Sequence, residues 1–191
     1  MDIILIRHGE TEDNIKSIFS NDTTKLTELG KKQMLNTAKI LKKYSFTKVI
    51  ISEYFRTKQS LEYLGITGIE HSIDKRVNEF NFGVLKGASI DGAQEKYRDV
   101  FTDWYNDPYN FVLPNGESQK QLLERVSVLY KELINNNESV LIITHDGVIR
   151  AFICALFETK DVYFKLKSDN GSISIIRHEN GYSRLYKYNE T

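Results

Sequence analysis

The hydrophobic positions of the chain form four short runs that are separated by longer, mixed segments. The runs IILI at 3–6, VIIS at 49–52 and VLIIT at 140–144 are continuous and rich in β-branched residues, which is typical of strands buried on both faces. The fourth run, SISII at 172–176, begins a pair of alternating segments. Asn180-Gly181 lies between those two segments and predicts a hairpin turn.

The segments between these runs carry apolar residues at helical spacing. Helices are expected over 27–43, 117–134 and 147–157, and another is expected to begin just after Ser52. Strands that alternate with helices predict an α/β fold, a three-layer sandwich with a mostly parallel central sheet flanked by helices. The residues expected to face the core are Met34, Leu35, Ala38 and Leu41 in the first segment, Leu122, Val126, Leu129 and Leu133 in the second, and Ile149, Phe152, Ile153 and Leu156 in the third.

The region 78–116 interrupts this alternation. It is rich in Phe, Tyr and Gly, and it contains the only two prolines, Pro108 and Pro114. The region is too short for a second domain. We therefore interpret residues 1–191 as one domain in which this excursion forms a cap or lid over a cleft.

Composition and charge narrow the classes of partner. Lys plus Arg and Asp plus Glu both number 26, so the formal net charge is zero, which argues against a broad nucleic-acid or membrane surface. The single cysteine, Cys154, lies in an apolar run and is expected to be a buried thiol. We expect neither a signal peptide nor a membrane span, and the cytoplasm is the expected location.

Two histidines occupy matching positions. His8 follows Arg7 and the run at 3–6, and His145 follows the run at 140–144. The carboxyl ends of parallel strands open onto the ligand crevice of an α/β sheet, so both imidazoles would face it if their strands are neighbours. One such histidine is more simply a core or turn residue. Two in matched positions, beside an arginine, favour a functional site.

The arginines suggest what this site binds. Arg56 is expected in the first turns of the helix after Ser52, where the helix dipole favours anions rather than cations. It is either an ordinary solvated residue or part of an anion site. With Arg7, His8 and His145 it outlines a pocket for a dianionic phosphoryl group, because a planar guanidinium binds phosphate through two hydrogen bonds.

The same four residues suggest phosphoryl transfer, which needs mainly positioning and charge neutralisation. A neutral imidazole such as that of His8 is a competent nucleophile and forms a phosphohistidine. The arginines would help to keep His8 unprotonated near neutral pH. His145 could then donate a hydrogen bond to a non-bridging oxygen.

The segment RHGETEDN at 7–14 resembles the signature of the histidine phosphatase superfamily, the phosphoglycerate mutase-like proteins. The resemblance continues in order along nearly the whole chain. The other segments that carry it are LTELGKKQ at 26–33, SEYFRTKQS at 52–60, NEFNFGVLKG at 78–87, PNGES at 114–118 and THDGVIR at 144–150.

This resemblance implies roles residue by residue. His8 is the expected phosphorylated nucleophile, and Glu79 is the expected proton donor that protonates the leaving group and later activates water. Taken alone, Glu79 would be interpreted as a solvated loop residue, but beside an anionic phosphate its pKa should be raised. The residues expected to hold the phosphoryl group are Arg7, Gly9, Asn14, Arg56 and His145.

Two positions depart from the usual pattern of the superfamily. Lys86 reverses a charge that is common near the rim of the cleft, so it either attracts an anionic substrate or is a surface change. Asp146 stands directly after His145, where glycine is frequent, and it would be harmless if it pointed outward. No metal-ligand spacing emerges, and we expect neither a metal nor another cofactor.

The expected function is hydrolysis of a small-molecule phosphomonoester. Mutases of the superfamily that use a bisphosphate primer carry an inserted segment with extra substrate arginines, whereas region 88–116 of this chain contains only Arg98. The stretch TDWYNDPYNFVLPNGES is similar to the α-ribazole phosphatase branch and to broad-specificity phosphatases. Its aromatic residues either line a substrate pocket or pack in the core: Trp104, Tyr105, Tyr109 and Phe111.

Three other functions stay open at this point. One is phosphoryl transfer of the phosphoglycerate mutase type, and another is a metallophosphatase. The third is a non-catalytic module that binds a phospho-ligand without turnover. The sequence does not predict the oligomeric state.

Overall fold

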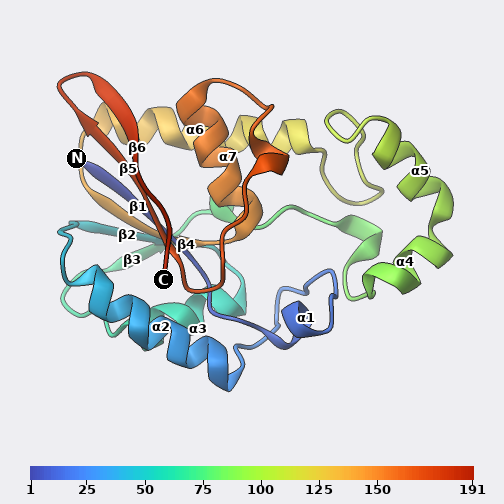
Figure 1. Ribbon diagram of the computed structural model, residues 1–191, viewed down its shortest axis with the longest axis horizontal. Coiled ribbons are helices and arrows are strands. Elements are labelled where there is room, and N and C mark those ends of the chain that lie inside the picture. The colour runs from blue at the N-terminus through green and yellow to red at the C-terminus, as the bar shows by residue number, and fades with distance from the viewer.

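The computed structural model describes residues 1–191 and has a six-stranded sheet between two layers of helices (Figure 1). The strands are β1 (Asp2–Arg7), β2 (Lys48–Ile51), β3 (His71–Ile73), β4 (Val140–Thr144), β5 (Ile173–Glu179) and β6 (Tyr182–Glu190). Their order is β3-β2-β4-β1-β5-β6; the first four pair in parallel, and β5 pairs antiparallel with both β1 and β6. The predicted α/β class and the mostly parallel sheet are confirmed.

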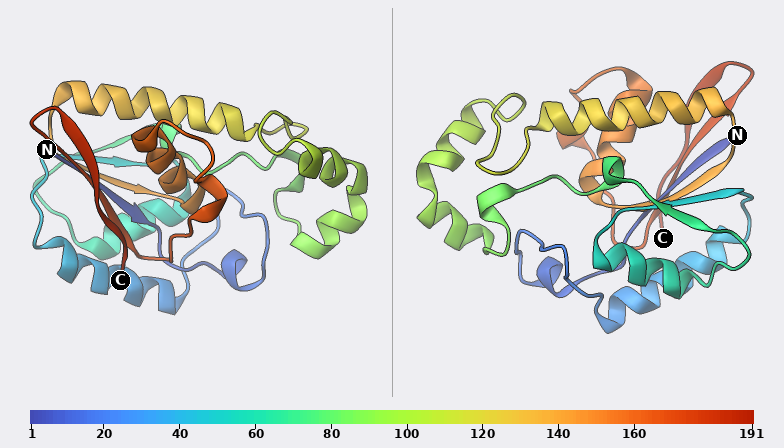
Figure 2. Two further views of the ribbon diagram at one scale, coloured as in Figure 1. Left: turned by 45° about the horizontal axis from the view of Figure 1, so that its top comes forward. Right: turned by 180° about the vertical axis from the view of Figure 1, so that it is seen from behind.

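Two pairs of long helices cover the faces of the sheet (Figures 1 and 2). One face carries α2 (Glu28–Leu41) and α3 (Phe55–Leu64), and the other carries α6 (Gln119–Asn136) and α7 (Asp146–Phe157). The short α1 (Glu12–Ile15) follows β1. Short 3-10 helices occupy Lys75–Val77, Gly83–Leu85 and Tyr163–Lys165. None of the helices is long and apolar enough to cross a membrane.

Alternate residues of the central strands supply the two halves of the core. In β1, Ile3 and Leu5 belong to the apolar cluster under α6 and α7, whereas Ile4 and Ile6 belong to the cluster under α2 and α3. None of these four side chains is exposed. Burial on both faces requires apolar residues at every position, which explains the continuous runs in the sequence.

One local prediction was wrong, and one strand was missed. Leu35 of α2 is 50% exposed, because it lies about 100° around the helix from the buried Met34. The edge strand β3 was not predicted, since all three of its residues are exposed and it carries no buried pattern. The predicted hairpin is confirmed: Asn180 and Gly181 join β5 to β6 with φ of 52° and 79°, as a tight two-residue turn requires.

The region 78–116 leaves the sheet at its carboxyl edge and contains two helices that the sequence did not predict, α4 (Ile90–Lys96) and α5 (Arg98–Asn106). Figure 2 shows both helices standing to one side, beyond the ends of the strands. The two ends of this excursion pack tightly, since a Cβ on Gly83 would lie 2.1 Å from the Pro114 carbonyl oxygen. Gly83 also has a φ of 53°, so a larger residue would be strained there.

Candidate active site

The carboxyl edge of the sheet brings together the four residues that outlined the predicted pocket. Because β1 and β4 are parallel neighbours with Arg7 opposite Thr144, His8 and His145 follow adjacent strand ends. The N–H of His8 donates to the Thr144 carbonyl at 3.0 Å, and the two imidazole centres are 5.2 Å apart. Arg56, the second residue of α3, lies between the two imidazoles.

Arg56 is buried, with 1% of its surface exposed, so it is not an ordinary solvated residue. Its Nε lies 3.2 Å from His8 Nε2 and 3.2 Å from His145 Nδ1. Its Nη1 donates to the Asn21 carbonyl at 2.9 Å. The guanidinium carbon lies 4.8 Å from the centre of the Tyr54 ring, which is a cation–π contact. These contacts fix the guanidinium in the centre of the site.

Arg7 is the second cation of the pocket. Its Nη1 donates to the Ser168 carbonyl, and its buried Nε has no hydrogen-bond partner. The hydrogen-bond partners of Arg7 and Arg56 are therefore backbone carbonyls and imidazole nitrogens, none of which is negatively charged. Buried cations are normally paired with anions. This arrangement favours an anionic ligand.

Hydrogen bonds define the tautomer of each histidine. His8 Nδ1 lies 2.7 Å from the Gly9 carbonyl, which only accepts, so Nδ1 carries the proton and Nε2 keeps its lone pair. The Nε–H of Arg56 only donates, so His145 Nδ1 accepts from it. His145 Nε2 then donates to the Ser52 hydroxyl at 2.8 Å. Both lone pairs therefore face the same guanidinium.

The pKa values of both histidines lie well below the ordinary value of 6.5. Burial is the largest cause at each site, because an imidazolium loses its hydration there. Arg56 lowers both pKa values further, and Arg7 contributes to each. Burial therefore outweighs the arginines that the sequence pointed to. Both imidazoles are neutral near pH 7.

Glu79 lines the same cavity as His8, Arg7 and Arg56. Its Oε1 accepts a hydrogen bond from the N–H of Phe80 at 2.9 Å. Burial raises its pKa above the ordinary 4.5 although Phe80 and Arg56 oppose the shift. A carboxyl group that holds its proton to higher pH is suited to act as an acid.

Asn14 and Gly9 differ in their relation to the cavity. Asn14 lines it, and its Oδ1 accepts from the N–H of Thr11 at 3.0 Å and from Asn170 Nδ2 at 3.2 Å. Both bonds use Oδ1, so Asn14 Nδ2 is the atom that can donate a hydrogen bond to a ligand in the cavity. Gly9 lies behind His8, because its N–H donates to Ser60 Oγ at 3.2 Å and its carbonyl faces His8 Nδ1. Its glycine identity follows from packing, since a Cβ there would lie 2.4 Å from the Gly30 carbonyl oxygen.

The two departures from the superfamily pattern are both charge-compensated. Asp146 lines the cavity but forms an ion pair with Arg150 one turn along α7, and it accepts the N–H of Ser168 at 2.8 Å. Lys86 forms an ion pair with Asp22 at 3.1 Å. Neither position adds an unpaired charge to the pocket.

The sequence reasoning missed several residues that contact the predicted site. Ser52 accepts from His145, the carbonyl of Ser168 binds Arg7, and Asn170 Nδ2 donates to the His8 carbonyl at 3.1 Å. Ser52 stands at a strand end four positions before Arg56, and that position was a usable signal. Ser168 and Asn170 lie in a polar loop before β5, which has no such pattern.

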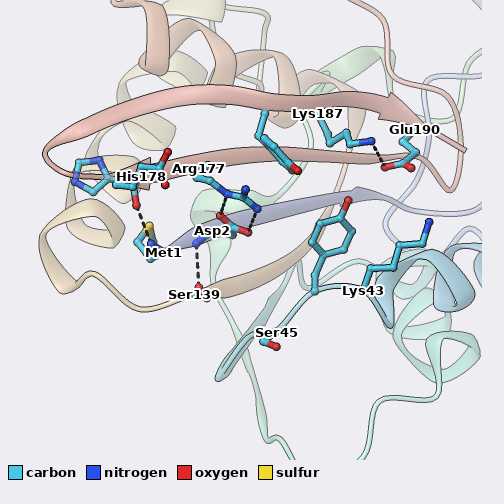
Figure 3. Close-up of a pocket in the computed structure, with 12 residues that line it drawn as sticks. Met1, Asp2, Lys43, Ser45, Ser139, Arg177, His178, Lys187 and Glu190 are labelled. Atoms are coloured by element: carbon cyan, nitrogen blue, oxygen red, sulfur yellow. Dashed lines mark hydrogen bonds and ion pairs between the residues drawn. The ribbon is translucent and has the colours of Figure 1, made fainter.

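Another pocket, of about 670 Å³, lies at the opposite end of the sheet, where β1 begins (Figure 3). Asp2 pairs there with Arg177 at 2.9 Å, and Lys187 pairs with Glu190 at 3.5 Å. The amino group of Met1 donates to the His178 carbonyl at 2.7 Å. The charges of both ion pairs are matched within the pocket, which distinguishes it from the site around Arg56.

The mostly parallel sheet, with two histidines and two arginines at its carboxyl edge, agrees with what the resemblance to the phosphoglycerate mutase-like phosphatases and mutases implied. The chain belongs to the histidine phosphatase superfamily (branch 1), whose family model matches residues 3–191. The suspected family is therefore confirmed. The chain is accordingly an enzyme of the phosphatase and mutase kind.

Individual relatives span nearly the whole chain. Phosphoserine phosphatase 1 of Hydrogenobacter thermophilus is 28% identical over 197 residues, which cover 99% of this chain and 92% of the relative. A 2,3-bisphosphoglycerate-dependent phosphoglycerate mutase of Nitrobacter hamburgensis is 30% identical over 165 residues, covering 81% and 80%. The crystal structure of the α-ribazole phosphatase from Shigella flexneri matches with a TM-score of 0.91 at 26% identity, covering 100% of this chain and 96% of that one.

Proposed function

We propose that the protein hydrolyses small-molecule phosphomonoesters through a phosphohistidine on His8, with Glu79 as the proton donor. The observation that carries this proposal is the pairing of Arg7 and Arg56 with uncharged partners around two neutral imidazoles. A phosphoryl group would supply the missing negative charge.

The first step is attack by His8 on phosphorus. The lone pair on His8 Nε2 forms the N–P bond while the bond from phosphorus to the alcohol oxygen breaks, and Glu79 gives its proton to that oxygen. The Nδ1–H of His8 stays bonded to the Gly9 carbonyl, which stabilises the positive charge that develops on the ring.

The non-bridging oxygens would be bound by Arg7, Arg56 and the Nδ2 of Asn14. A phosphoryl oxygen would also replace Arg56 as the partner of His145 Nδ1. His145 would then carry its proton on Nδ1 and donate it to this oxygen. Ser52 permits this change, because a hydroxyl donates as well as it accepts and can therefore serve either tautomer of His145.

The second step returns the enzyme to its starting state. The Glu79 carboxylate takes a proton from water, the water oxygen attacks phosphorus, and the N–P bond breaks to release inorganic phosphate and neutral His8. These two reaction steps need no metal and no other cofactor. That the enzyme works in the cytoplasm and that region 78–116 acts as its cap stay predictions.

Hydrolysis is the function we favour over mutase activity. Arg98 is the only arginine of the excursion, and it is exposed. The excursion therefore does not supply the additional buried arginines that would bind a second acidic group of a substrate. The similarity to a phosphoglycerate mutase supports the alternative, in which the phosphoryl group is transferred from His8 back to a sugar acid. Phosphoserine phosphatase and α-ribazole phosphatase relatives support hydrolysis.

A panel of phosphomonoesters, assayed with and without a chelator, tests the proposal. The panel includes phosphoserine, 3-phosphoglycerate and α-ribazole phosphate, and free phosphate is measured. We expect release of phosphate that the chelator does not reduce, and a loss of about 10³-fold or more in His8→Gln. The exposed His71 offers the matched control, and His71→Gln should retain activity.

Three results would contradict the proposal. Activity that the chelator abolishes would indicate a metallophosphatase, and phosphate binding without turnover of any ester would indicate a binding module. Isomerisation of 3-phosphoglycerate in the presence of 2,3-bisphosphoglycerate, without net release of phosphate, would indicate a mutase.

A further inference from the structure

A second cavity opens beside the phosphate pocket. Its volume is about 220 Å³, and it shares Glu79, Phe82 and Asp146 with the cavity of about 330 Å³ that contains His8 and both arginines. The two cavities together fall within the ~300–1,000 Å³ that small-molecule sites occupy. We call the second cavity the aromatic chamber, after the residues that dominate its wall: Phe80, Phe82, Trp104, Tyr163 and Phe164.

The walls of the aromatic chamber are flat and ordered by mutual packing. The rings of Phe80 and Trp104 are stacked, with centres 6.0 Å apart and planes 7° from parallel. Phe82 meets Phe80 edge-on at 5.1 Å. Phe164 packs edge-on against Tyr163 at 5.1 Å and is itself 65% exposed. Such a wall favours a planar aromatic guest, since aromatic rings gain energy from offset stacking and edge-to-face contact.

The polar groups of the aromatic chamber are few. Gln119, the first residue of α6, is only 4% exposed and lines the chamber, and its side-chain amide makes no hydrogen bond within the protein. Asp146 and Arg150 line it as an ion pair. The Nε of Arg150 has no hydrogen-bond partner, but the charge of Arg150 is paired with Asp146, so the chamber offers a free amide and no unpaired cation. A second phosphate or carboxylate on the substrate would have to compete with Asp146 for Arg150.

The position of Glu79 connects the two cavities chemically. Under the proposed function, Glu79 protonates the leaving oxygen, so that oxygen must come within hydrogen-bond reach of its carboxyl group. Since Glu79 lies on the wall common to both cavities, the carbon attached to the leaving oxygen is directed toward the aromatic chamber.

We infer that the substrates of this enzyme are phosphomonoesters of alcohols that carry a planar aromatic ring, and that this ring binds in the aromatic chamber between Trp104 and Phe82. A ring with a polar edge would also bond to Gln119. This inference rests on the proposed function. It also distinguishes the four aromatic residues of the stretch 102–118: Trp104 lines the chamber, Tyr105 is 67% exposed, Tyr109 lines a different cavity and Phe111 packs against the core.

A pair of alkyl phosphates tests the inference. Benzyl phosphate and glycerol 3-phosphate both release an alcohol, so they differ in the ring rather than in an activated leaving group. We expect kcat/KM for benzyl phosphate to exceed that for glycerol 3-phosphate by about tenfold or more. Trp104→Leu should remove most of this preference by lowering kcat/KM for benzyl phosphate alone.

The neighbouring Tyr105 gives the matched control, because it lies on the same helix but is exposed. Tyr105→Leu should keep the preference. Gln119→Met, which removes the amide at similar volume, should lower kcat/KM for a pyridylmethyl phosphate more than kcat/KM for benzyl phosphate. Equal kcat/KM for benzyl and glycerol esters in the unmodified enzyme, or equal loss of both in a folded Trp104→Leu variant, would overturn the inference while leaving the proposed function intact.

A binding measurement tests whether the aromatic chamber binds an aromatic ring, even if no ester is hydrolysed. Trp104 is the only tryptophan in the chain, so its indole N–H gives a single side-chain signal in a ¹⁵N-edited NMR spectrum. Titration of the His8→Gln variant with benzyl alcohol should shift this signal, and glycerol at the same concentration should not. No shift with benzyl alcohol would overturn the aromatic chamber as a binding site.

Discussion

At the residue scale, the donors and acceptors around Arg56 prepare His8 for attack. A guanidinium N–H can only donate, so the two imidazole nitrogens that face it, His8 Nε2 and His145 Nδ1, both present lone pairs. The Gly9 carbonyl accepts from the other nitrogen of His8, and the Ser52 hydroxyl from the other nitrogen of His145. His8 therefore has the tautomer that a nucleophilic Nε2 requires.

Ser52 should act through His145 as a positioning residue. The hydroxyl is wholly buried and also accepts from the N–H of Tyr54 at 3.2 Å. We predict that Ser52→Ala lowers kcat by about tenfold with a smaller change in KM, because the hydrogen bond that orients the imidazole of His145 is lost. Ser52→Thr should recover most of the rate.

Two measurements separate this role from a purely structural one. The ¹⁵N chemical shift of His145 Nε2 reports its hydrogen bond to Ser52 and should change in Ser52→Ala. Thermal unfolding should show that the variant is folded at the assay temperature. An unchanged kcat, or a lower kcat with an unchanged Nε2 shift, would exclude the positioning role.

The pH dependence of kcat should report Glu79. Its pKa is raised by burial and by the carboxylate of Asp146, while Phe80, Arg56 and Arg7 oppose the shift. The acid works only while protonated, so kcat should fall as the pH rises through the raised pKa of Glu79. The depressed pKa of His8 predicts that this histidine causes no loss of kcat near pH 6.5.

Glu79→Gln is the matched variant for that profile. It keeps the shape of the side chain but cannot release a proton, so kcat should fall by about 10²–10⁴-fold. The remaining activity should lose the alkaline decline. A profile that keeps the same alkaline decline in Glu79→Gln would assign that ionisation to another group.

At the element scale, the start of α7 determines where Glu79 lies. Gly147 is the second residue of that helix, and a Cβ on it would lie 2.5 Å from Glu79 Oε1 and 3.0 Å from the Tyr163 hydroxyl. We predict that Gly147→Ala lowers kcat by about 10²-fold, because it displaces the proton donor by a fraction of an ångström to an ångström. The helix itself should tolerate alanine well.

The control for this prediction is another helical glycine. Gly92 lies in α4, and a Cβ there would meet only the Ser89 hydroxyl at 2.9 Å. Gly92→Ala should keep kcat within about twofold. An active Gly147→Ala enzyme with wild-type kcat would show that Glu79 does not need its observed position.

Whether an element could be predicted depended on how strongly its burial constrains the sequence. β1 and β4 are buried on both faces, so their apolar runs identified them. β3, α4 and α5 could not be found in this way: β3 is exposed on an edge, and α4 and α5 bury only Ala93 and Phe101. β3 and α4 carry almost no periodic signal, whereas α5 carries Val100, Phe101 and Trp104 at helical spacing, a signal that the sequence reasoning missed.

At the scale of the whole molecule, the site combines segments that are far apart in the sequence. His8, Arg56 and His145 could be predicted as neighbours because strand ends of a parallel sheet meet at one edge. The aromatic chamber could not be predicted as a unit. Its Phe80 and Trp104 come from the excursion and its Tyr163 from the loop after α7, and only the folded chain places them together.

The central claim is that the phosphoryl group passes through His8, and trapping the intermediate tests it most directly. The enzyme is mixed briefly with a phosphomonoester and quenched in alkali, where phosphohistidine survives, and the peptides are analysed by mass spectrometry. We predict one phosphate on the peptide that contains His8, labile to acid and absent from His8→Gln. Steady hydrolysis with no phosphorylated His8 peptide, together with full turnover in His8→Gln, would contradict the account.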